Sequence, residues 1–188
     1  MKKVGFFGGS FDPIHFGHLN LAIQILEKCN LDEILFCPAF QSPFKQNRTP
    51  IAPPKDRYEM VEKAIEKIPA FAITPIEIER GGVSYTVETL RSLQKEGIQY
   101  HLVLSEETAS DIQLWKEPEE ILHLAPPIVG VKNDLPPDSP FKQVQIPTFD
   151  ISSTEIRERF KKKLYCGHLI PAIALDYIVQ HRLYSYPN

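Results

Sequence analysis

Short runs of consecutive apolar residues alternate along the chain with segments in which apolar residues recur every three or four positions. The runs have the length of buried strands and occupy residues 4–7, 34–37, 71–74, 101–104, 128–131 and 144–146. The helical spacing predicts helices over residues 17–29, 55–68, 85–96, 107–115, 118–123, 153–163 and 171–182. This alternation predicts a doubly wound α/β fold, Rossmann-like, with a mainly parallel sheet and helices on both faces.

Length and charge narrow the choice of partners. The chain has 188 residues, of which 43% are hydrophobic, so we expect a single domain over residues 1–188. The formal net charge is −3 at pH 7. A protein that coats nucleic acid needs a broad positive surface, so nucleic acid is not an expected partner. Any phosphate-binding site must therefore be confined to a small part of the surface.

Cysteine usage and hydropathy point to a soluble cytoplasmic protein. The three cysteines are an odd number without CxxC spacing, which implies neither a disulfide framework nor a structural zinc site. The basic start Met1-Lys2-Lys3 is followed by an apolar run that Gly8-Gly9 soon interrupts, so export is not expected. No apolar stretch approaches the length of a membrane span.

The segment between the first predicted strand and helix has an unusual composition. It reads Gly8-Gly9-Ser10-Phe11-Asp12-Pro13-Ile14-His15-Phe16-Gly17-His18. Glycines after a buried strand let the backbone approach a ligand, and the helix start offers free N–H groups to an anion. His15 and His18 are three positions apart, share one helical face and could carry positive charge toward phosphate. Two unrelated surface histidines near a turn are the plainer alternative.

The loop fits neither of the two common nucleotide motifs. The GxGxxG pattern of a dinucleotide site is missing, and so is the Lys-Ser/Thr pair of a P-loop. In doubly wound sheets, however, ligands bind beyond the carboxyl ends of the strands. We therefore expect a phosphate site of another kind after the first strand.

A second candidate phosphate site lies near the end of the chain. Ile151-Ser152-Ser153-Thr154-Glu155-Ile156-Arg157 opens a predicted helix, in which Ser152 and Glu155 fit a capping box. Capping alone would explain those two residues. The hydroxyls of Ser153 and Thr154 and the guanidinium of Arg157 suit a phosphate as well.

Both segments resemble the two signatures of the HxGH nucleotidyltransferase superfamily, and most closely those of bacterial nicotinate-nucleotide adenylyltransferases. The family's usual threonine is Ser10 here. The resemblance implies that His15 and His18 contact ATP phosphates, with Arg157 as a third catalytic residue, and that Gly17 lets adenosine approach the helix. The remaining expected ATP-binding residues are Gly8, Gly9, Ser10, Phe11, Glu107, Ser152, Ser153 and Thr154.

Weaker similarities suggest where the acceptor nucleotide binds. Lys45 aligns with a cation for the acceptor phosphate, and Phe44 stands where the family has histidine. Arg57 would serve either phosphate or a structural pairing. Tyr85 and Thr86 belong to a segment similar to the family's SYTxxTL, at a helix start that could receive a carboxylate. Trp115, which could equally be a core residue, matches the tryptophan that stacks on the pyridine ring.

One segment departs from the family pattern. After the fourth strand the family has Gly-x-Asp, whereas this chain has Ser105-Glu106-Glu107. Loss of the glycine could crowd a close backbone approach, and Glu107 could replace the aspartate only with a longer reach.

Together these features predict an enzyme that transfers AMP from ATP to nicotinate mononucleotide, with Mg²⁺ on the triphosphate and no metal site of its own. The alternatives are another HxGH adenylyl- or cytidylyltransferase with a different acceptor, or a non-catalytic nucleotide-binding relative. We expect a monomer or small homo-oligomer.

Overall fold

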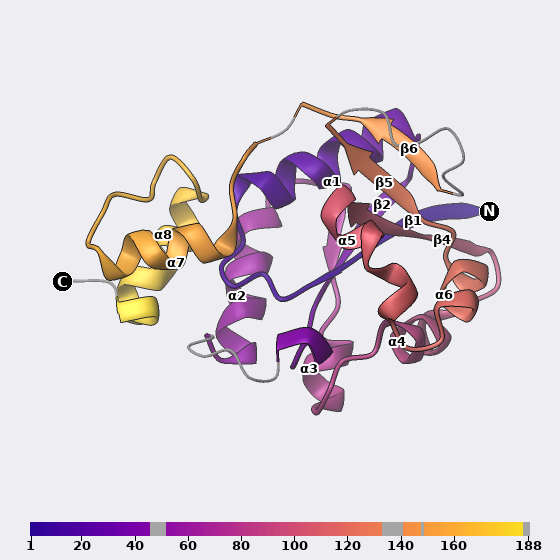
Figure 1. Ribbon diagram of the computed structural model, residues 1–188, viewed down its shortest axis with the longest axis horizontal. Helices are drawn as coiled ribbons and strands as arrows, with labels where there is room; N and C mark the ends of the chain where they lie inside the picture. The colour runs from indigo at the N-terminus through magenta and orange to yellow at the C-terminus, as the bar shows by residue number, and fades with distance from the viewer. Residues whose placement is uncertain (46–51, 133–140, 148, 186–188) are drawn as a thin grey trace.

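The centre of the molecule is a six-stranded sheet, in the order β3-β2-β1-β4-β5-β6 (Figure 1). The computed structural model describes residues 1–45, 52–132, 141–147 and 149–185. Each neighbouring pair of strands is parallel. The strands are β1 (Lys2–Gly9), β2 (Glu33–Pro38), β3 (Phe71–Ile73), β4 (Ile98–Ser105), β5 (Ile128–Val131) and β6 (Lys142–Gln145). The predicted fold class is confirmed.

The helices follow the predicted order with a few differences in length. They are α1 (Phe16–Lys28), α2 (Pro54–Ile65), α3 (Ile76–Arg80), α4 (Thr86–Leu93), α5 (Glu106–Ser110), α6 (Pro118–Leu124), α7 (Ser153–Lys161) and α8 (Ala172–Gln180). Short 3₁₀ turns are η1 (Pro43–Lys45), η2 (Ile112–Leu114) and η3 (Leu183–Ser185).

Two of the helical predictions needed correction, and one helix was missed. The helix predicted over 107–115 is divided into α5 and η2 at Asp111, whose φ of −96° and ψ of 0° end the α-helix. The helix predicted over 85–96 ends at Leu93, and Gly97 takes a left-handed φ of 80° in the turn before β4. Helix α3 was not predicted, because five residues are too few to show a helical period.

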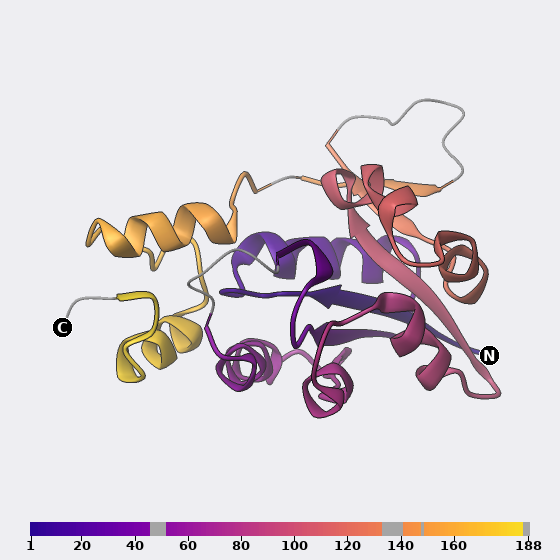
Figure 2. The same cartoon turned by 60° about the horizontal axis from the view of Figure 1, so that its bottom comes forward.

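Apolar side chains form a core on each face of the sheet, and Figure 2 shows helices on both sides of it. One core joins α1, α2, α7 and α8 to the sheet, and the other joins α4, α5 and α6 to it. This burial on both faces explains why the strands are continuous apolar runs. Within the described ranges, no helix combines the length and apolar character needed to cross a membrane.

Helices α7 and α8 lie beyond the end of the sheet, next to α2 and the beginning of α1 (Figure 1). The strand order reverses between β1 and β4, because the chain first builds outward to β3 and then returns to the other side of β1. In doubly wound folds this is where ligands bind. The loop from β1 to α1 therefore occupies the switch point, with α7 close by.

Candidate active site

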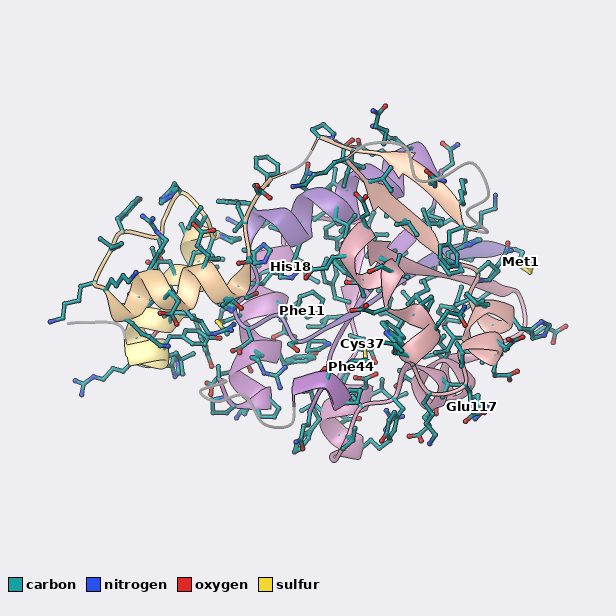
Figure 3. The ribbon with its side chains drawn as sticks, in the orientation of Figure 1. Met1, Phe11, His18, Cys37, Phe44 and Glu117 are labelled. Atoms are coloured by element: carbon teal, nitrogen blue, oxygen red, sulfur yellow. The ribbon has the colours of Figure 1, made fainter. Side chains whose placement is uncertain are left out.

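The loop that follows β1 packs its backbone against an aromatic cluster. A Cβ on Gly9 would lie 3.0 Å from the Phe11 ring, so this glycine lets the ring pack closely. Phe11 is 1% exposed, and its ring centroid lies 5.4 Å from that of Phe7 and 5.6 Å from that of Phe36. Its ring also packs edge-on against His18 at 5.1 Å (Figure 3). The Phe11 side chain thus supports His18 from within the core, and its expected contact with ATP stays a prediction.

The two histidines stack on each other at the start of α1. Their ring centroids are 3.6 Å apart with an angle of 25° between the planes. The backbone N–H of His15 donates to Nδ1 of His18 over 3.2 Å. An accepting nitrogen carries no proton, so the proton of the neutral His18 ring sits on Nε2, which is a donor.

His15 differs from the charged histidine that we expected. Its side chain is buried at 6% exposure, and within the described part of the chain its Nδ1 has no hydrogen-bond partner. Burial lowers the pKa of His15 to about 4. The ring is therefore neutral near pH 7, and it can offer a hydrogen bond but no charge.

Gly17 makes room for this arrangement. A Cβ at Gly17 would lie 3.0 Å from Nδ1 and 3.1 Å from Cε1 of His15, and 3.6 Å from the carbonyl oxygen of Ile151. The glycine thus accommodates the His15 ring, a role additional to the expected approach of adenosine. The nearness of Ile151 also shows how closely the segment before α7 approaches α1.

The second predicted phosphate site meets the first one, as expected. Ser153 Oγ donates to the carbonyl oxygen of Pro13 over 2.9 Å, and Arg157 donates to that of Asp12 over 2.6 Å. Ser152 caps α7 by accepting from the N–H of Glu155 over 3.1 Å. The predicted convergence of the two helix starts is confirmed. The positive dipole ends of the two helices favour an anion between them.

Thr154 completes this edge of the site. Its hydroxyl accepts from Arg157 over 3.1 Å, which leaves the hydroxyl on the exposed side of the helix start. At the opposite edge, Gly8 is exposed and Ser10 partly exposed at the end of β1. These residues are placed where a phosphate could reach them.

Asp12 is a central residue that the sequence analysis did not single out. Its carboxylate is buried at 3% exposure and accepts from the N–H of Ala52 over 3.0 Å and from the hydroxyl of Tyr184 over 2.6 Å. The other carboxylate oxygen lies 3.6 Å from Arg157. Asp12 thus joins the glycine loop to three remote segments, and it orients Arg157.

Arg57 makes the structural pairing that the sequence analysis gave as one of its two roles. It is 2% exposed, and its three nitrogens each donate to a carbonyl oxygen, 3.0 Å away on Ala52, 2.7 Å on Ser10 and 2.8 Å on Phe40. Burial lowers its pKa, and the charge of Asp12 opposes this effect. Three of its donors are directed to the backbone, and its contact with an acceptor phosphate stays a prediction.

Aromatic side chains gather on the predicted acceptor side. The ring of Phe44, in the segment after β2 (Figure 3), lies 6.4 Å from that of Trp115, which is partly buried. Lys116 lies over the ring of Tyr85 at 4.5 Å. Lys45 belongs to η1, but its side chain falls outside the described part of the structure.

The beginning of α4 is partly exposed beside these rings. Tyr85 is the N-cap residue with an extended backbone, and Thr86 is the first helical residue. Their N–H groups could receive a carboxylate. The structure thus places Tyr85, Trp115 and Phe44 in one region.

The conformation of Ser105 explains how the chain accommodates a serine after β4, where the family has glycine. Its φ of −79° and ψ of 162° are open to any residue, so the backbone itself does not require glycine here. Its hydroxyl caps α5 by accepting from the N–H of Thr108 over 3.3 Å. Glu106 accepts from the N–H of Lys132 over 3.4 Å, and Glu107 is exposed.

Comparison with known proteins agrees with this geometry. The cytidylyltransferase-like family model matches residues 6–159. The probable nicotinate-nucleotide adenylyltransferase of Dictyoglomus thermophilum is 37% identical over 195 residues, which covers 97% of this chain and 99% of that protein. That of Bacillus cytotoxicus is 35% identical, with 98% and 100% of the two chains covered.

Solved structures extend the agreement to the fold. Nicotinic acid mononucleotide adenylyltransferase of Plasmodium falciparum, complexed with NaAD, superposes with a TM-score of 0.79 over 100% of this chain and 99% of that chain, at 20% identity. At this identity the likeness concerns the fold. With its sheet order, its two converging helix starts and these relatives, the chain belongs to the cytidylyltransferase-like family, and within it to the nicotinate-nucleotide adenylyltransferases.

Proposed function

We propose that the protein transfers AMP from ATP to nicotinate mononucleotide, which yields nicotinate adenine dinucleotide and pyrophosphate. The observation that carries this proposal is the junction of α7 with the glycine loop before α1, where Ser153 and Arg157 donate hydrogen bonds that bring the two distant signatures together. The names of full-length relatives at 35–37% identity support the same reaction.

The reaction needs alignment and positive charge rather than a covalent enzyme intermediate. A phosphate oxygen of the acceptor attacks the α-phosphorus of ATP, and the bond to the β-phosphate oxygen breaks on the opposite side. The Nε2–H of His18 would donate to the α-phosphate or to the leaving oxygen, and neutral His15 would assist by hydrogen bonding.

The outgoing pyrophosphate would be held at the start of α7. Ser152, Ser153 and Thr154 present hydroxyls and backbone N–H groups there, and Arg157 supplies the charge. The glycines of the β1 loop and Gly17 would border the adenosine side, and Glu107 would face the ribose from the start of α5, just after β4. The acceptor would lie toward Tyr85, Thr86 and Trp115, with Lys45 near its phosphate.

Mg²⁺ would accompany ATP and neutralise part of the triphosphate charge. The groups at the two helix starts are mostly N–H and O–H donors, which suit phosphate oxygens rather than a cation. Within the described ranges, no cluster of three or more His, Cys, Asp or Glu side chains is placed to hold a metal ion. These residues therefore fit the phosphates, and the ion would be held by phosphate oxygens and water.

A panel of acceptors tests the proposal. The purified protein is incubated with ATP, Mg²⁺ and one of nicotinate mononucleotide, nicotinamide mononucleotide or phosphopantetheine, and pyrophosphate is measured. We expect release with nicotinate mononucleotide above all. Release with another acceptor alone would identify a different transferase of the family, and ATP binding without release would identify a nucleotide-binding relative.

We further propose a cytoplasmic location, which the three buried free cysteines support.

A further inference from the structure

A buried polar cluster lies directly behind the proposed acceptor site and is not used by the mechanism above. Its members are Glu77 of α3 at 4% exposure, Ser84 at 7% and Thr89 of α4 at 0%. Burying a carboxyl group is unfavourable unless hydrogen bonds compensate for the lost water. The position of Glu77 therefore calls for a structural or functional reason.

Polar side chains surround the Glu77 carboxyl. Thr89 donates to its Oε1 over 2.6 Å, and Arg80 in turn donates to the hydroxyl of Thr89 over 2.8 Å. Ser84 and Cys37 lie close enough to interact with the carboxyl. Burial raises the pKa of Glu77, and the interactions with Thr89, Ser84, Arg80 and Cys37 act against this shift.

Ser84 extends the cluster to the backbone on both sides of the acceptor region. Its Oγ accepts from the N–H of Phe40 over 2.9 Å, and its own N–H donates to the carbonyl oxygen of Gln41 over 2.8 Å. Gln41 also forms a parallel bridge with Val83. The segment after β2, which leads to Phe44, is thereby fixed against the segment that leads into α4.

Thr89 links Glu77 to the first turn of α4. It lies one turn into α4, and its hydroxyl also reaches the carbonyl oxygen of Tyr85 at 3.5 Å. Glu77 thus bonds to Thr89, which follows Tyr85 and Thr86, and interacts with Ser84, which precedes them. The N–H groups of Tyr85 and Thr86 are those that face the proposed acceptor carboxylate. A small shift of a binding group of this kind can cost a large factor in rate or affinity.

We propose that Glu77 is a positioning residue for the acceptor: through Ser84 and Thr89 it holds the start of α4 against the segment after β2, so that the N–H groups of Tyr85 and Thr86 are preorganised for the acceptor's carboxylate. This inference rests on the proposed function. It assigns Glu77 no contact with ATP, because among the described residues its hydrogen bond leads to Thr89 of α4 and its other interaction partners are Ser84, Arg80 and Cys37, none of which is a histidine of the ATP side or a residue of α7.

Single-hydroxyl deletions test the role without removing the buried acid. In Ser84→Ala and Thr89→Val we expect the KM for nicotinate mononucleotide to rise about tenfold, as for loss of one hydrogen bond, while the KM for ATP stays within about twofold. Glu77→Ala should give a larger rise, and Glu77→Gln, whose amide oxygen can still accept, should recover most of it. Ser92→Ala, which removes a hydroxyl on the exposed side of α4, is the matched control.

Thermal unfolding of each variant shows whether it is folded. If Glu77→Ala does not fold, the two hydroxyl variants decide. Unchanged acceptor KM in folded Ser84→Ala and Thr89→Val, or an equal rise in both KM values, overturns the positioning role and leaves the proposed function intact. A wild-type protein that releases no pyrophosphate with nicotinate mononucleotide overturns the proposed function, and the inference with it.

Discussion

The hydroxyl of Tyr184 donates a 2.6 Å hydrogen bond to the carboxylate of Asp12, although the two residues are 172 positions apart in the chain. Both neighbourhoods are strained, because Phe11 has a φ of 47° and Tyr184 a φ of 58°, in the left-handed region that non-glycine residues rarely adopt. Burial and the nearby Asp12 raise the pKa of the Tyr184 hydroxyl, which stays protonated and remains a donor. The turn at η3 therefore supports the glycine loop through the hydrogen bond from Tyr184 to Asp12.

Removing that hydroxyl should destabilise the protein. Tyr184→Phe leaves a buried carboxylate with one partner fewer, so we expect the free energy of unfolding to fall by about 1.5–3 kcal/mol in urea titration. Tyr165→Phe, at a ring that is 67% exposed, is the control. Equal stability of the two variants would show that the hydrogen bond to Asp12 contributes nothing.

The His18 side chain should be needed for turnover. We expect His18→Ala to fold and to lose on the order of 10²-fold in kcat, because a preorganised donor to the reacting phosphate is removed. Steady-state kinetics and circular dichroism measure the two effects. His123→Ala, at an exposed position of α6, should behave like wild type. Near-normal kcat in His18→Ala would remove this residue from the mechanism.

Gly17 should act through His15. The Cβ of Gly17→Ala would displace the imidazole from a 3.0 Å contact, so we expect kcat to fall about tenfold. A double-mutant cycle separates this effect from others: in a His15→Ala background, Gly17→Ala should cause little further loss. Additive losses would mean that the glycine serves the ligand directly.

The buried His15 should make stability depend on pH. Its pKa is about 4 in the folded protein and 6.5 in the unfolded chain, so the unfolded state binds the proton more readily. Its stabilising contribution is complete above pH 6.5 and is lost as the pH falls toward 4, by at most about 3 kcal/mol. Urea titrations at pH 7 and pH 4.5 should show a smaller difference for His15→Asn than for wild type. An identical difference would contradict the low pKa of His15.

The acceptor side should favour nicotinate over nicotinamide mononucleotide. Loss of a charge-assisted hydrogen bond at the start of α4 costs about 1.5–3 kcal/mol, so kcat/KM should differ by at least about tenfold. Competition between the two acceptors, with products separated by chromatography, measures the ratio. Equal use of the two acceptors would contradict the proposed contact of the acceptor's carboxylate with Tyr85 and Thr86.

The parts of the fold that depend on local sequence were predicted, and the parts that depend on remote contacts were not. Apolar runs and helical spacing predicted the strands and most helices, and the capping pattern at Ser152 correctly predicted the start of α7. The convergence of α1 and α7 was also predicted, because each segment separately has the chemistry of a phosphate site.

The missed residues have partners that no local pattern reveals. The sequence left two roles open for Arg57 and gave Asp12 no role of its own within the glycine loop. Only the folded chain directs the arginine to three backbone carbonyl groups and the aspartate to Tyr184. Glu77 lies in a helix of five residues, too short to show a buried face. One signal was available for Phe11: an aromatic residue directly after a strand and two glycines could have been recognised as a core residue.

The link between Asp12 and Tyr184 also bears on how the protein is made. The glycine loop leaves the ribosome early, but the phenol that holds its aspartate is synthesised 172 residues later. The glycine loop can therefore become rigid only after residue 184 has been synthesised, and a chain that stops before this residue would carry the loop in a loosened form. Termination between residues 161 and 184 should then lower activity even though every signature motif has been translated.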